Sequence, residues 1–458
     1  MVDWAKPPGR STEEAAKAGK ALRSRLTRQD QGEWRPWPGR PDPVEVLQRS
    51  DAGRLADLLP IRYGRMIESP FTFYRGAAAI MASDLAAARV SGIRAQICGD
   101  AHLLNFGGFG TPESRFVFDV NDFDETTLGA WEWDVKRLVT SVVIAGRHLG
   151  LEPSDVRAAT LECACGYRER IRAFATMPVL EVWYARLDEA KLAEIVGSAQ
   201  ERREYAASIK KAKSESRAHA FPRMAEDVGG DLRIVDDPPL LYHPKETAGF
   251  LGMVSTTFAA YRTTLHDDRK RLFDRFALQD AAYKVVGVGS VGTRCLVALF
   301  QAGENDAIVL QMKEARASVF QTYADAPEWK NEGDRVVTGQ RALQSASDLF
   351  LGYGRANDGH DYYIRQLRDM KTSADIDDMS AQALQDYAQF CGWALARAHA
   401  KASGCAATIA GYLGRSSAFD DAMLEFAESY AAQNDRDYDA LVEAVRAGRV
   451  TARKDTGS

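Results

Sequence analysis

Apolar residues recur at three- and four-residue steps in one long stretch of the chain and predict a helix there. The stretch runs from Ser380 to about Lys401, and its apolar positions are Leu384, Tyr387, Cys391, Leu395 and Ala398. This spacing places the five side chains along one face of an α-helix. A second helix is expected over residues 153–175, with Ser154 as its N-cap.

A different pattern, typical of strands, occupies residues 283–313. The β-rich run YKVVGVGSVGTRCLVALF is followed by the turn QAGEND and then by AIVLQMK. These features predict a hairpin of strands. In the last strand residues 308, 310 and 312 face one side, while residues 309, 311 and Lys313 face the other.

The remaining patterns describe the organisation of the chain. The first 45 residues or so are rich in Pro, Arg, Gly and Trp, which favours an extended arm over a packed element. A join between two lobes is expected near residues 205–265, where the chain is charged and turn-like. Trp131, Trp133 and Trp393 are expected in the core.

Composition narrows the class of protein. With 458 residues the chain is long enough for two or three domains or for one large two-lobed enzyme. Its 64 acidic and 59 basic residues give a net charge of only -5. This charge balance gives no indication that the chain binds a nucleic acid or a membrane surface. The first residues lack the apolar core of a signal peptide, so a cytoplasmic location is expected. The six cysteines are expected to be reduced.

Candidate chemistry first appears in the run CGDAHLLNF. Asp100 and Asn105 lie five residues apart, so one loop can present a carboxylate and an amide oxygen to the same small volume. A carboxylate can act as a base, and an amide oxygen is a ligand for a hard cation.

A second acidic run, FDVNDFDE, follows within twenty residues. Asp119, Asp122 and Asp124 crowd together there, and such carboxylates repel one another unless a cation or protons neutralise them. An EF-hand is excluded because Phe123 stands where that loop needs an oxygen ligand and the central glycine is missing. The alternative is a turn in which Asp side chains accept local backbone hydrogen bonds.

The run Gly287, Val288, Gly289, Ser290, Val291, Gly292 is a candidate phosphate-binding loop, because small residues let backbone amides approach a phosphate. A dinucleotide-binding fold would need a helix directly after the third glycine. TRCLVALF is β-rich instead. A glycine loop between antiparallel strands, followed by Lys313 on the next strand, is the protein-kinase arrangement for ATP. The alternative for Lys313 is a solvated strand lysine.

These residues carry a resemblance to a known class of enzyme. GDAHLLN resembles the catalytic loop of aminoglycoside phosphotransferases and related small-molecule kinases, and NDFDE resembles their metal-binding segment. The resemblance implies Asp100 as the catalytic base and His102 as the histidine of the loop. It further implies Asn105 and Asp122 as Mg²⁺ ligands, with Asp124 as a second metal contact.

Two further positions bear on the same loop. Asp134, in WEWDVKRL, resembles the aspartate that braces the catalytic loop in those kinases, although an ordinary acid at a helix N-terminus would look the same. Cys98 stands where the kinase pattern begins with His, which puts the bracing of the loop in question.

The order of these motifs differs from that of kinases, because the catalytic loop precedes the glycine loop. The resemblance therefore implies an α+β, two-lobed protein-kinase-like fold that is circularly permuted and has extra helices. In this order a helix near residues 331–345 follows Lys313. The expected parts are an N-terminal arm and helical segment, a C-lobe-like catalytic region, an N-lobe-like nucleotide-binding β region and C-terminal helices completing the C-lobe. Their ranges are residues 1–95, 96–264, 265–372 and 373–458.

Nearly the whole chain also resembles a bacterial family known as domain of unknown function 2252 (DUF2252). The runs PIRYGRM, SPFTFYRGAA, CGDAHLLNFG, FDVNDFDET and RQLRDMK carry this resemblance. It implies a family and a fold but no substrate.

Several residues complete the expected nucleotide site. Glu332 is the favoured ion-pair partner of Lys313, with Gln340 and Gln344 as alternatives, and Gln366 in the hinge-like run YYIRQL is expected to contact the nucleotide. A separate group of arginines either binds an anionic substrate or lies on the surface. This group comprises Arg62, Arg65 and Arg75.

The expected function is that of an ATP- and Mg²⁺-dependent phosphotransferase acting on a small-molecule acceptor. Three alternatives stay open at this point: a nucleotide-binding regulator without catalysis, a nucleotidyl transferase, and an NAD-linked oxidoreductase that rests on the glycine loop alone. Sequence names neither the acceptor nor the oligomeric state.

Overall fold

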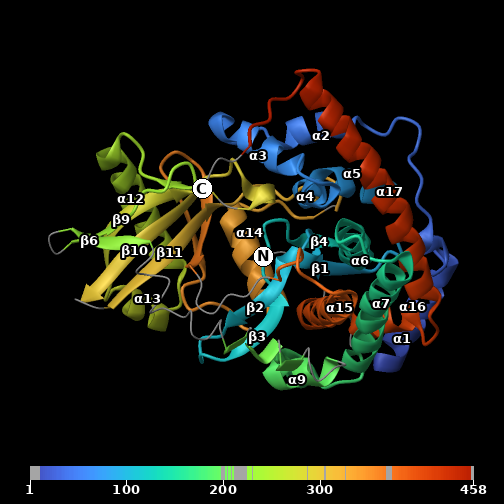
Figure 1. Cartoon of the computed structure of the whole chain (residues 1–458). Coiled ribbons are helices and arrows are strands. Elements are labelled where there is room, and N and C mark those ends of the chain that lie inside the picture. Colours follow the sequence, from blue (N-terminus) through green and yellow to red (C-terminus); the bar gives the residue numbers. More distant parts are fainter. Residues whose placement is uncertain are drawn as a thin grey trace.

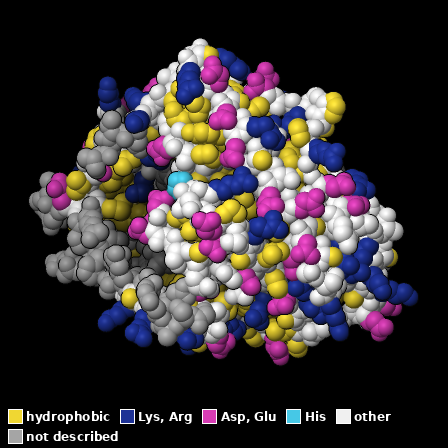
Figure 2. Space-filling view, turned by 45° about the vertical axis from the view of Figure 1, so that its right-hand side comes forward, with side chains coloured by type: hydrophobic (Ala, Val, Ile, Leu, Met, Phe, Trp, Pro, Cys, Tyr) yellow, Lys and Arg dark blue, Asp and Glu magenta, His cyan; other side chains and the backbone are white. Residues whose placement is uncertain are grey.

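The computed structural model describes residues 11–196, 202–203, 205–207, 209–210, 224–228, 231–285, 287–303, 306–324, 326–367 and 374–454. Its α+β architecture places the largest sheet at one side of the molecule and most of the helices at the other, with α14 (Glu332–Leu343) between them (Figure 1). Acidic and basic side chains are interspersed over the face shown in Figure 2.

The large sheet is antiparallel, with the strand order β12-β13-β11-β10-β9-β8. Its strands are β8 (Leu241–Tyr242), β9 (Ala277–Lys284), β10 (Cys295–Gly303), β11 (Asp306–Glu314), β12 (Gly352–Arg355) and β13 (Asp361–Gln366). The predicted alternation is confirmed, because Ile308, Leu310 and Met312 share one apolar cluster while Val309 packs in another. Helices α12 (Thr247–Thr264) and α13 (Asp267–Phe273) cover the first of these faces.

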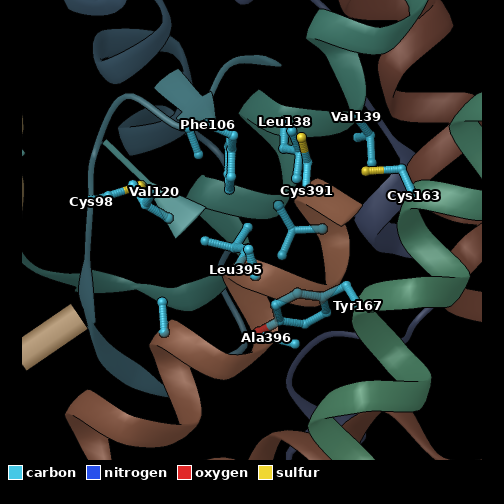
Figure 3. Packing of buried hydrophobic residues seen from close by; sticks show 14 of the residues in the cluster. Cys98, Phe106, Val120, Leu138, Val139, Cys163, Tyr167, Cys391, Leu395 and Ala396 are labelled. Carbon is cyan, nitrogen blue, oxygen red and sulfur yellow. The ribbon is translucent and has the colours of Figure 1, made fainter. Parts of the chain in front are cut away.

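The helical part is built on four long helices. They are α6 (Trp131–His148), α7 (Pro153–Phe174), α15 (Ala381–Ser403) and α17 (Ala418–Arg446). Their apolar faces meet in the largest core cluster. Figure 3 shows part of it, contributed by Leu138, Val139, Cys163, Tyr167, Cys391, Leu395 and Ala396 of the helices and by Phe106 and Val120 of two strands. Burial of such side chains stabilises the fold by roughly 1.5–3 kcal/mol each.

Short strands support the segment that carries the acidic motifs. They form one pair, β1 (Arg94–Ile97) with β4 (Thr127–Ala130), and one three-stranded sheet of β2 (Phe106–Gly110), β3 (Phe116–Val120) and β5 (Leu187–Asp188). Helices α8 (Val179–Tyr184) and α9 (Glu189–Ile195) belong to this half, whereas the strand pair β6 (Ala225–Val228) and β7 (Asp231–Ile234) packs against the large sheet (Figure 1).

The N-terminal segment corrects one prediction. Instead of an extended arm, residues 12–21 form α1 (Thr12–Ala21), which packs on α16 (Ala406–Leu413). Ser11 and Glu14 make a capping box that starts this helix, a signal present in the sequence and overlooked. Four more helices follow, namely α2 (Pro43–Ser50), α3 (Leu59–Met66), α4 (Pro70–Gly76) and α5 (Ala78–Ala87).

The predicted helices are present, with one wrong cap. Ser380 accepts a hydrogen bond from the backbone of Ala383 and caps α15, and Asn331 caps α14 in the same way. Helix α7 begins with Pro153 at its first position, and its N-cap is Glu152 rather than Ser154. In the part of the chain that is described, no helix combines the length and the apolar character needed to cross a membrane.

Candidate active site

The loop of residues 98–105 connects β1 to β2, ends in the short helical turn Leu103–Asn105 and is clamped at its start. The carboxylate of Asp134 accepts hydrogen bonds from the backbone N–H groups of Cys98 at 2.8 Å and Gly99 at 2.9 Å. His399, near the end of α15, contacts the same carboxylate at 3.1 Å. Asp134 therefore braces the loop as expected, and the bracing acts on the backbone, so Cys98 in place of His does not abolish it.

Gly99 allows this loop to turn sharply. Its φ is +84°, a left-handed conformation that disfavours other residues. A Cβ at this position would also lie 2.3 Å from the carbonyl oxygen of Glu125. The loop is thereby held against the segment that carries the second acidic run.

Asp100 lies at the centre of the loop and is held by Arg137 of α6. The Arg137 Nε donates to Asp100 Oδ1 at 2.5 Å, and Asn105 Nδ2 donates to the backbone oxygen of Asp100 at 2.8 Å. Burial raises the pKa of Asp100, and the carboxylates of Asp122 and Asp124 add to this, although Arg137 opposes it. A carboxylate with a raised pKa and a fixed orientation suits a general base.

His102 lies beside this carboxylate in surroundings that disfavour its charged form. Its Nε2 is 3.8 Å from Asp100 Oδ2, and its buried Nδ1 has no hydrogen-bond partner in the described ranges of the chain. Burial lowers the pKa of His102 well below its ordinary value, and the charges of Arg137 and Arg75 lower it further. A neutral imidazole can shape the site but cannot supply a positive charge at neutral pH.

The acidic run follows β3 and is tied to the 98–105 loop. The backbone N–H of Asn121 donates to the carbonyl of Asn105 at 2.8 Å. The Asp124 N–H donates to Asp122 Oδ1 at 3.1 Å, so the local turn considered as the alternative is present. This turn directs both carboxylates toward the large sheet, where they meet Lys313.

Lys313 of β11 forms an ion pair with Asp124, and its Nζ lies 4.0 Å from Asp122 Oδ2. Only 4% of the lysine side chain is exposed, so it is not a solvated strand lysine. Burial would lower the pKa of Lys313, but the Asp124 carboxylate raises it well above its ordinary value. Burial likewise opposes ionisation of Asp122, yet Lys313 and Arg365 hold its pKa below the usual range.

The glycine-rich loop joins β9 to β10 next to these residues. Ser290 Oγ donates to Asp124 Oδ2 at 3.4 Å, and Gly292 adopts φ +87°. The N-terminal segment holds the loop in place, because Leu55 N–H donates to Gly292 O and the Arg54 side chain donates to Val291 O, both at 2.7 Å. Strand β10 follows the loop, so the helix that an NAD-binding fold requires there is absent and that alternative is wrong.

The other two glycines of the loop stand in unstrained positions. Gly287 precedes the 3-10 turn Val288–Ser290, and a Cβ there would meet no atom within 4 Å. A Cβ on Gly289 would lie 3.2 Å from the carbonyl oxygen of Arg75. The loop therefore has room for a ligand at its first glycine and packs tightly at its second.

The donor atoms of the site fit a hard divalent cation. Asn105 uses its Nδ2 for Asp100, so its Oδ1 is the atom left as a ligand. The Asp122 side chain is 30% exposed and has free coordination capacity, whereas both oxygens of Asp124 are engaged by Lys313, Ser290 and Tyr363. Amide and carboxylate oxygens of this kind are the ligands that Mg²⁺ prefers.

Three other residues of the expected nucleotide site have partners of their own, and Gln366 lies on β13, next to the strand of Lys313. Glu332 pairs with Arg335 at 2.5 Å and not with Lys313, while Gln340 donates to Gln344 at 2.9 Å. The backbone N–H of Gln366 donates to Asp348 at 2.5 Å.

The three arginines considered as anion ligands also differ from one another. Arg62 is neither a surface residue nor a ligand, because it is 1% exposed and donates to the Gly76 carbonyl at 2.9 Å. Arg65 and Arg75 are partly buried, and Arg75 adds its positive charge to the surroundings of Asp100.

Asp119 belongs to the framework and not to the site. Both of its oxygens accept hydrogen bonds from Arg397 of α15, and both side chains are 1% exposed. The backbone of Ser345 donates to the same carboxylate at 2.7 Å. A buried pair of this kind fixes the end of β3 against α15.

Sequence reasoning missed several residues of the site. No local pattern marks Arg137, which stands three positions after Asp134 and binds Asp100. Tyr363, on the strand next to that of Lys313, donates to Asp124 at 2.8 Å. Arg335 also reaches the acidic run, donating to the Asp124 carbonyl at 2.8 Å. Strand pairing brings Tyr363 opposite Lys313, a relationship that no local spacing reveals.

Comparison with known proteins adds one finding. A family model described as "Uncharacterized protein conserved in bacteria (DUF2252)" matches residues 54–444. None of the curated proteins or solved structures compared with the chain matches it. The matched range includes the 98–105 loop, the acidic run, the glycine-rich loop and Lys313.

Proposed function

The chain belongs to the family described as "Uncharacterized protein conserved in bacteria (DUF2252)", and we propose that it is an ATP- and Mg²⁺-dependent phosphotransferase acting on a small-molecule acceptor. One observation carries the proposal. Lys313 of β11, the carboxylates of Asp122 and Asp124, and Ser290 of the glycine-rich loop meet at one point although they come from distant parts of the chain. This is the set of groups that phosphoryl transfer from ATP requires.

We further propose that the fold is a circularly permuted, two-lobed kinase-like fold. In kinases a long helix leads directly into the catalytic loop. Here the hydroxyl oxygen of Ser403, at the end of α15, accepts a hydrogen bond from Gln96 N–H at 2.8 Å, just before the 98–105 loop. The end of α15 thus lies beside the start of the loop in space, which supports a permuted connection.

Each residue then has a distinct task. Bound ATP and Mg²⁺ would supply the phosphoryl group and the neutralisation of its charge. Asn105 and Asp122 are assigned to the cation, with Asp124 as a second contact. Lys313 is assigned to the phosphates, which requires it to exchange Asp124 for a phosphate oxygen.

Asp100 is assigned as the base that accepts the proton of the acceptor's hydroxyl or amine group. Arg137 positions it through the hydrogen bond at 2.5 Å and keeps the carboxylate charged. The clamp of Asp134 on Cys98 and Gly99 holds the whole loop, so the base is fixed before any ligand arrives. Such preorganised positioning is the main source of catalysis in this class of reaction.

The proposal is tested by calorimetric titration with ATP, with and without Mg²⁺, on the wild type and on Lys313→Met. We expect binding that depends on Mg²⁺ and weakens at least tenfold in the variant. Lys245→Met, at an exposed lysine outside the site, should behave as the wild type. Absence of ATP binding to the wild type, or equal affinity in Lys313→Met, would contradict the proposal.

A second experiment separates the possible reactions. The protein is incubated with ATP, Mg²⁺ and pools of candidate small-molecule acceptors, and the masses of the products are measured by mass spectrometry. Phosphoryl transfer adds roughly 80 Da and nucleotidyl transfer roughly 329 Da. ATP binding without any product would favour the regulatory alternative.

A further inference from the structure

A cavity of about 400 Å³ lies apart from the candidate active site, between the segment before α2, helix α5 and helix α6. Trp34 and Trp37 line it, and Lys136 of α6 and Asp84 of α5 contribute polar groups. Lys136 directly precedes Arg137, but successive side chains leave a helix about 100° apart. Arg137 therefore reaches Asp100 while Lys136 reaches this second cavity.

Lys136 is buried, and its Nζ has no hydrogen-bond acceptor among the residues that the structure describes. The residue is 3% exposed, and its Nζ lies 4.6 Å from the centre of the Phe426 ring. Glu132, one turn earlier, is engaged by Ser91 and Gln31, and among the described residues no carboxylate forms an ion pair with Lys136. An ammonium group buried in this way is unfavourable unless a partner is supplied.

Lys401 shows what a purely structural buried lysine does in the same protein. Its Nζ donates to the carbonyls of Arg341 at 2.8 Å and Gln344 at 2.6 Å. The pKa of both lysines is lowered to about 8 by burial, so burial alone does not distinguish them. The difference is that Lys136 has a cavity where Lys401 has acceptors.

The other groups around the cavity have their own partners or lie in solvent. Asp84 accepts two hydrogen bonds from Arg40 at 2.8 Å each and one from Tyr430 at 2.7 Å. Asp30 pairs with Arg89 at 3.0 Å, and the charged residues at positions 33 and 35 are exposed.

Among the described groups that line the cavity, the buried one that lacks a hydrogen-bond partner within reach of a ligand is the ammonium of Lys136. The indole N–H of Trp34 also makes no hydrogen bond in the described part of the chain, but its nitrogen is shielded from the cavity. Glu33 and Arg35 line the cavity and are exposed, so water satisfies their charges. A ligand that brings an acceptor atom to Lys136 would therefore supply the partner that the fold does not.

We propose that this cavity binds a small carboxylate with a flat apolar body, whose charge pairs with Lys136 and whose body lies against Trp34 and Trp37. The two indoles stand edge to face with ring centres 6.2 Å apart, and Trp34 is 4.9 Å from Tyr430. Aromatic walls of this kind favour planar apolar groups. A carboxylate supplies the acceptor that Lys136 lacks, and such charge-assisted hydrogen bonds are the stronger ones.

The test is calorimetric titration of the full chain with benzoate, phenylacetate and 2-naphthoate, each up to about 10 mM, a concentration that detects even millimolar affinity. Phenylacetamide serves as the uncharged counterpart of phenylacetate. We expect saturable binding of at least one carboxylate and weaker binding of the amide by on the order of tenfold or more. Failure of all three carboxylates to bind, equal affinity of acid and amide, or tighter binding of inorganic phosphate would overturn the proposal.

Two variants place the binding in this cavity. Lys136→Met keeps the length of the side chain and removes its charge, so carboxylate affinity should fall by on the order of tenfold or more. Lys20→Met, at an exposed lysine of α1, is the matched control and should bind as the wild type. If Lys136→Met does not fold, Trp37→Leu at the half-buried wall should still weaken binding. Unchanged affinity in whichever of these two variants folds would refute the site.

Discussion

Lys313 and Asp124, separated by 189 positions in the chain, form an ion pair on which Tyr363 and Ser290 also converge. The pair joins the large sheet to the acidic run that follows β3. Without nucleotide, the lysine neutralises carboxylates that would otherwise repel one another. The proposed function therefore requires an exchange of partners, in which a cation replaces Lys313 at the acids.

Replacing Asp100 by Asn should separate binding from turnover. The variant retains size and loses the base, so turnover should fall by about 10²- to 10⁴-fold while ATP affinity stays within a few-fold of the wild type. Product formation under single-turnover conditions and ATP calorimetry measure the two quantities. Asp377→Asn, at an acid whose side chain is 76% exposed, is the control. Full turnover in Asp100→Asn would show that another group acts as the base.

Arg137→Gln should change the pH dependence as well as the rate. Activity requires ionised Asp100 and is lost as the pH falls through the pKa of that carboxyl. Arg137 lowers this pKa against the effect of burial, so its removal should raise the pKa. The acidic limb of kcat/KM should then move to higher pH.

The control for this profile is Arg147→Gln, whose exposed side chain lies near the end of the same helix. It should leave the acidic limb in place. A lower rate in Arg137→Gln with an unmoved acidic limb would mean that Arg137 acts only on the structure.

In the glycine-rich loop, substitution by alanine should have different effects on stability at Gly292 and at Gly287. Gly292 has φ +87° and a neighbouring Arg54 side chain 3.2 Å from the position of an added Cβ, whereas Gly287 has an ordinary φ and open space. Gly292→Ala should therefore cost about 1–2 kcal/mol and weaken ATP binding, since a left-handed residue is strained. Gly287→Ala should be nearly neutral in thermal unfolding. Equal effects of the two substitutions would contradict this account of the loop.

The buried pair of Asp119 and Arg397 should matter for stability. Arg397→Met leaves a carboxylate buried without its partner, so the free energy of unfolding should fall by about 3–5 kcal/mol. Urea denaturation measures the loss. Arg147→Met breaks an exposed pair with Asp435 and should cost less than about 1 kcal/mol. Comparable losses in both variants would show that burial of the Asp119 pair is unimportant.

Local patterns were sufficient for several of the elements and for picking out the acidic residues of the candidate site. The apolar stripe predicted α15 and the alternation in residues 307–313 predicted β11, because side-chain direction follows helix and strand geometry directly. The spacing of Asp100 and Asn105 placed both in one loop, and the acidic run was recognisable by charge alone. The capping box of Ser11 and Glu14 was equally readable, and overlooking it led to the wrong expectation of an extended arm.

The sequence by itself determined which residues carry charge, which sides of helices and strands are apolar, and which short segments can turn. Tertiary structure alone decided the partners: Lys313 with Asp124 and not Glu332, Arg137 with Asp100, and Asp134 with the backbone of Cys98 and Gly99. The physical reason is that an ion pair needs two groups within a few ångströms. That separation is set by how whole elements pack and not by spacing along the chain.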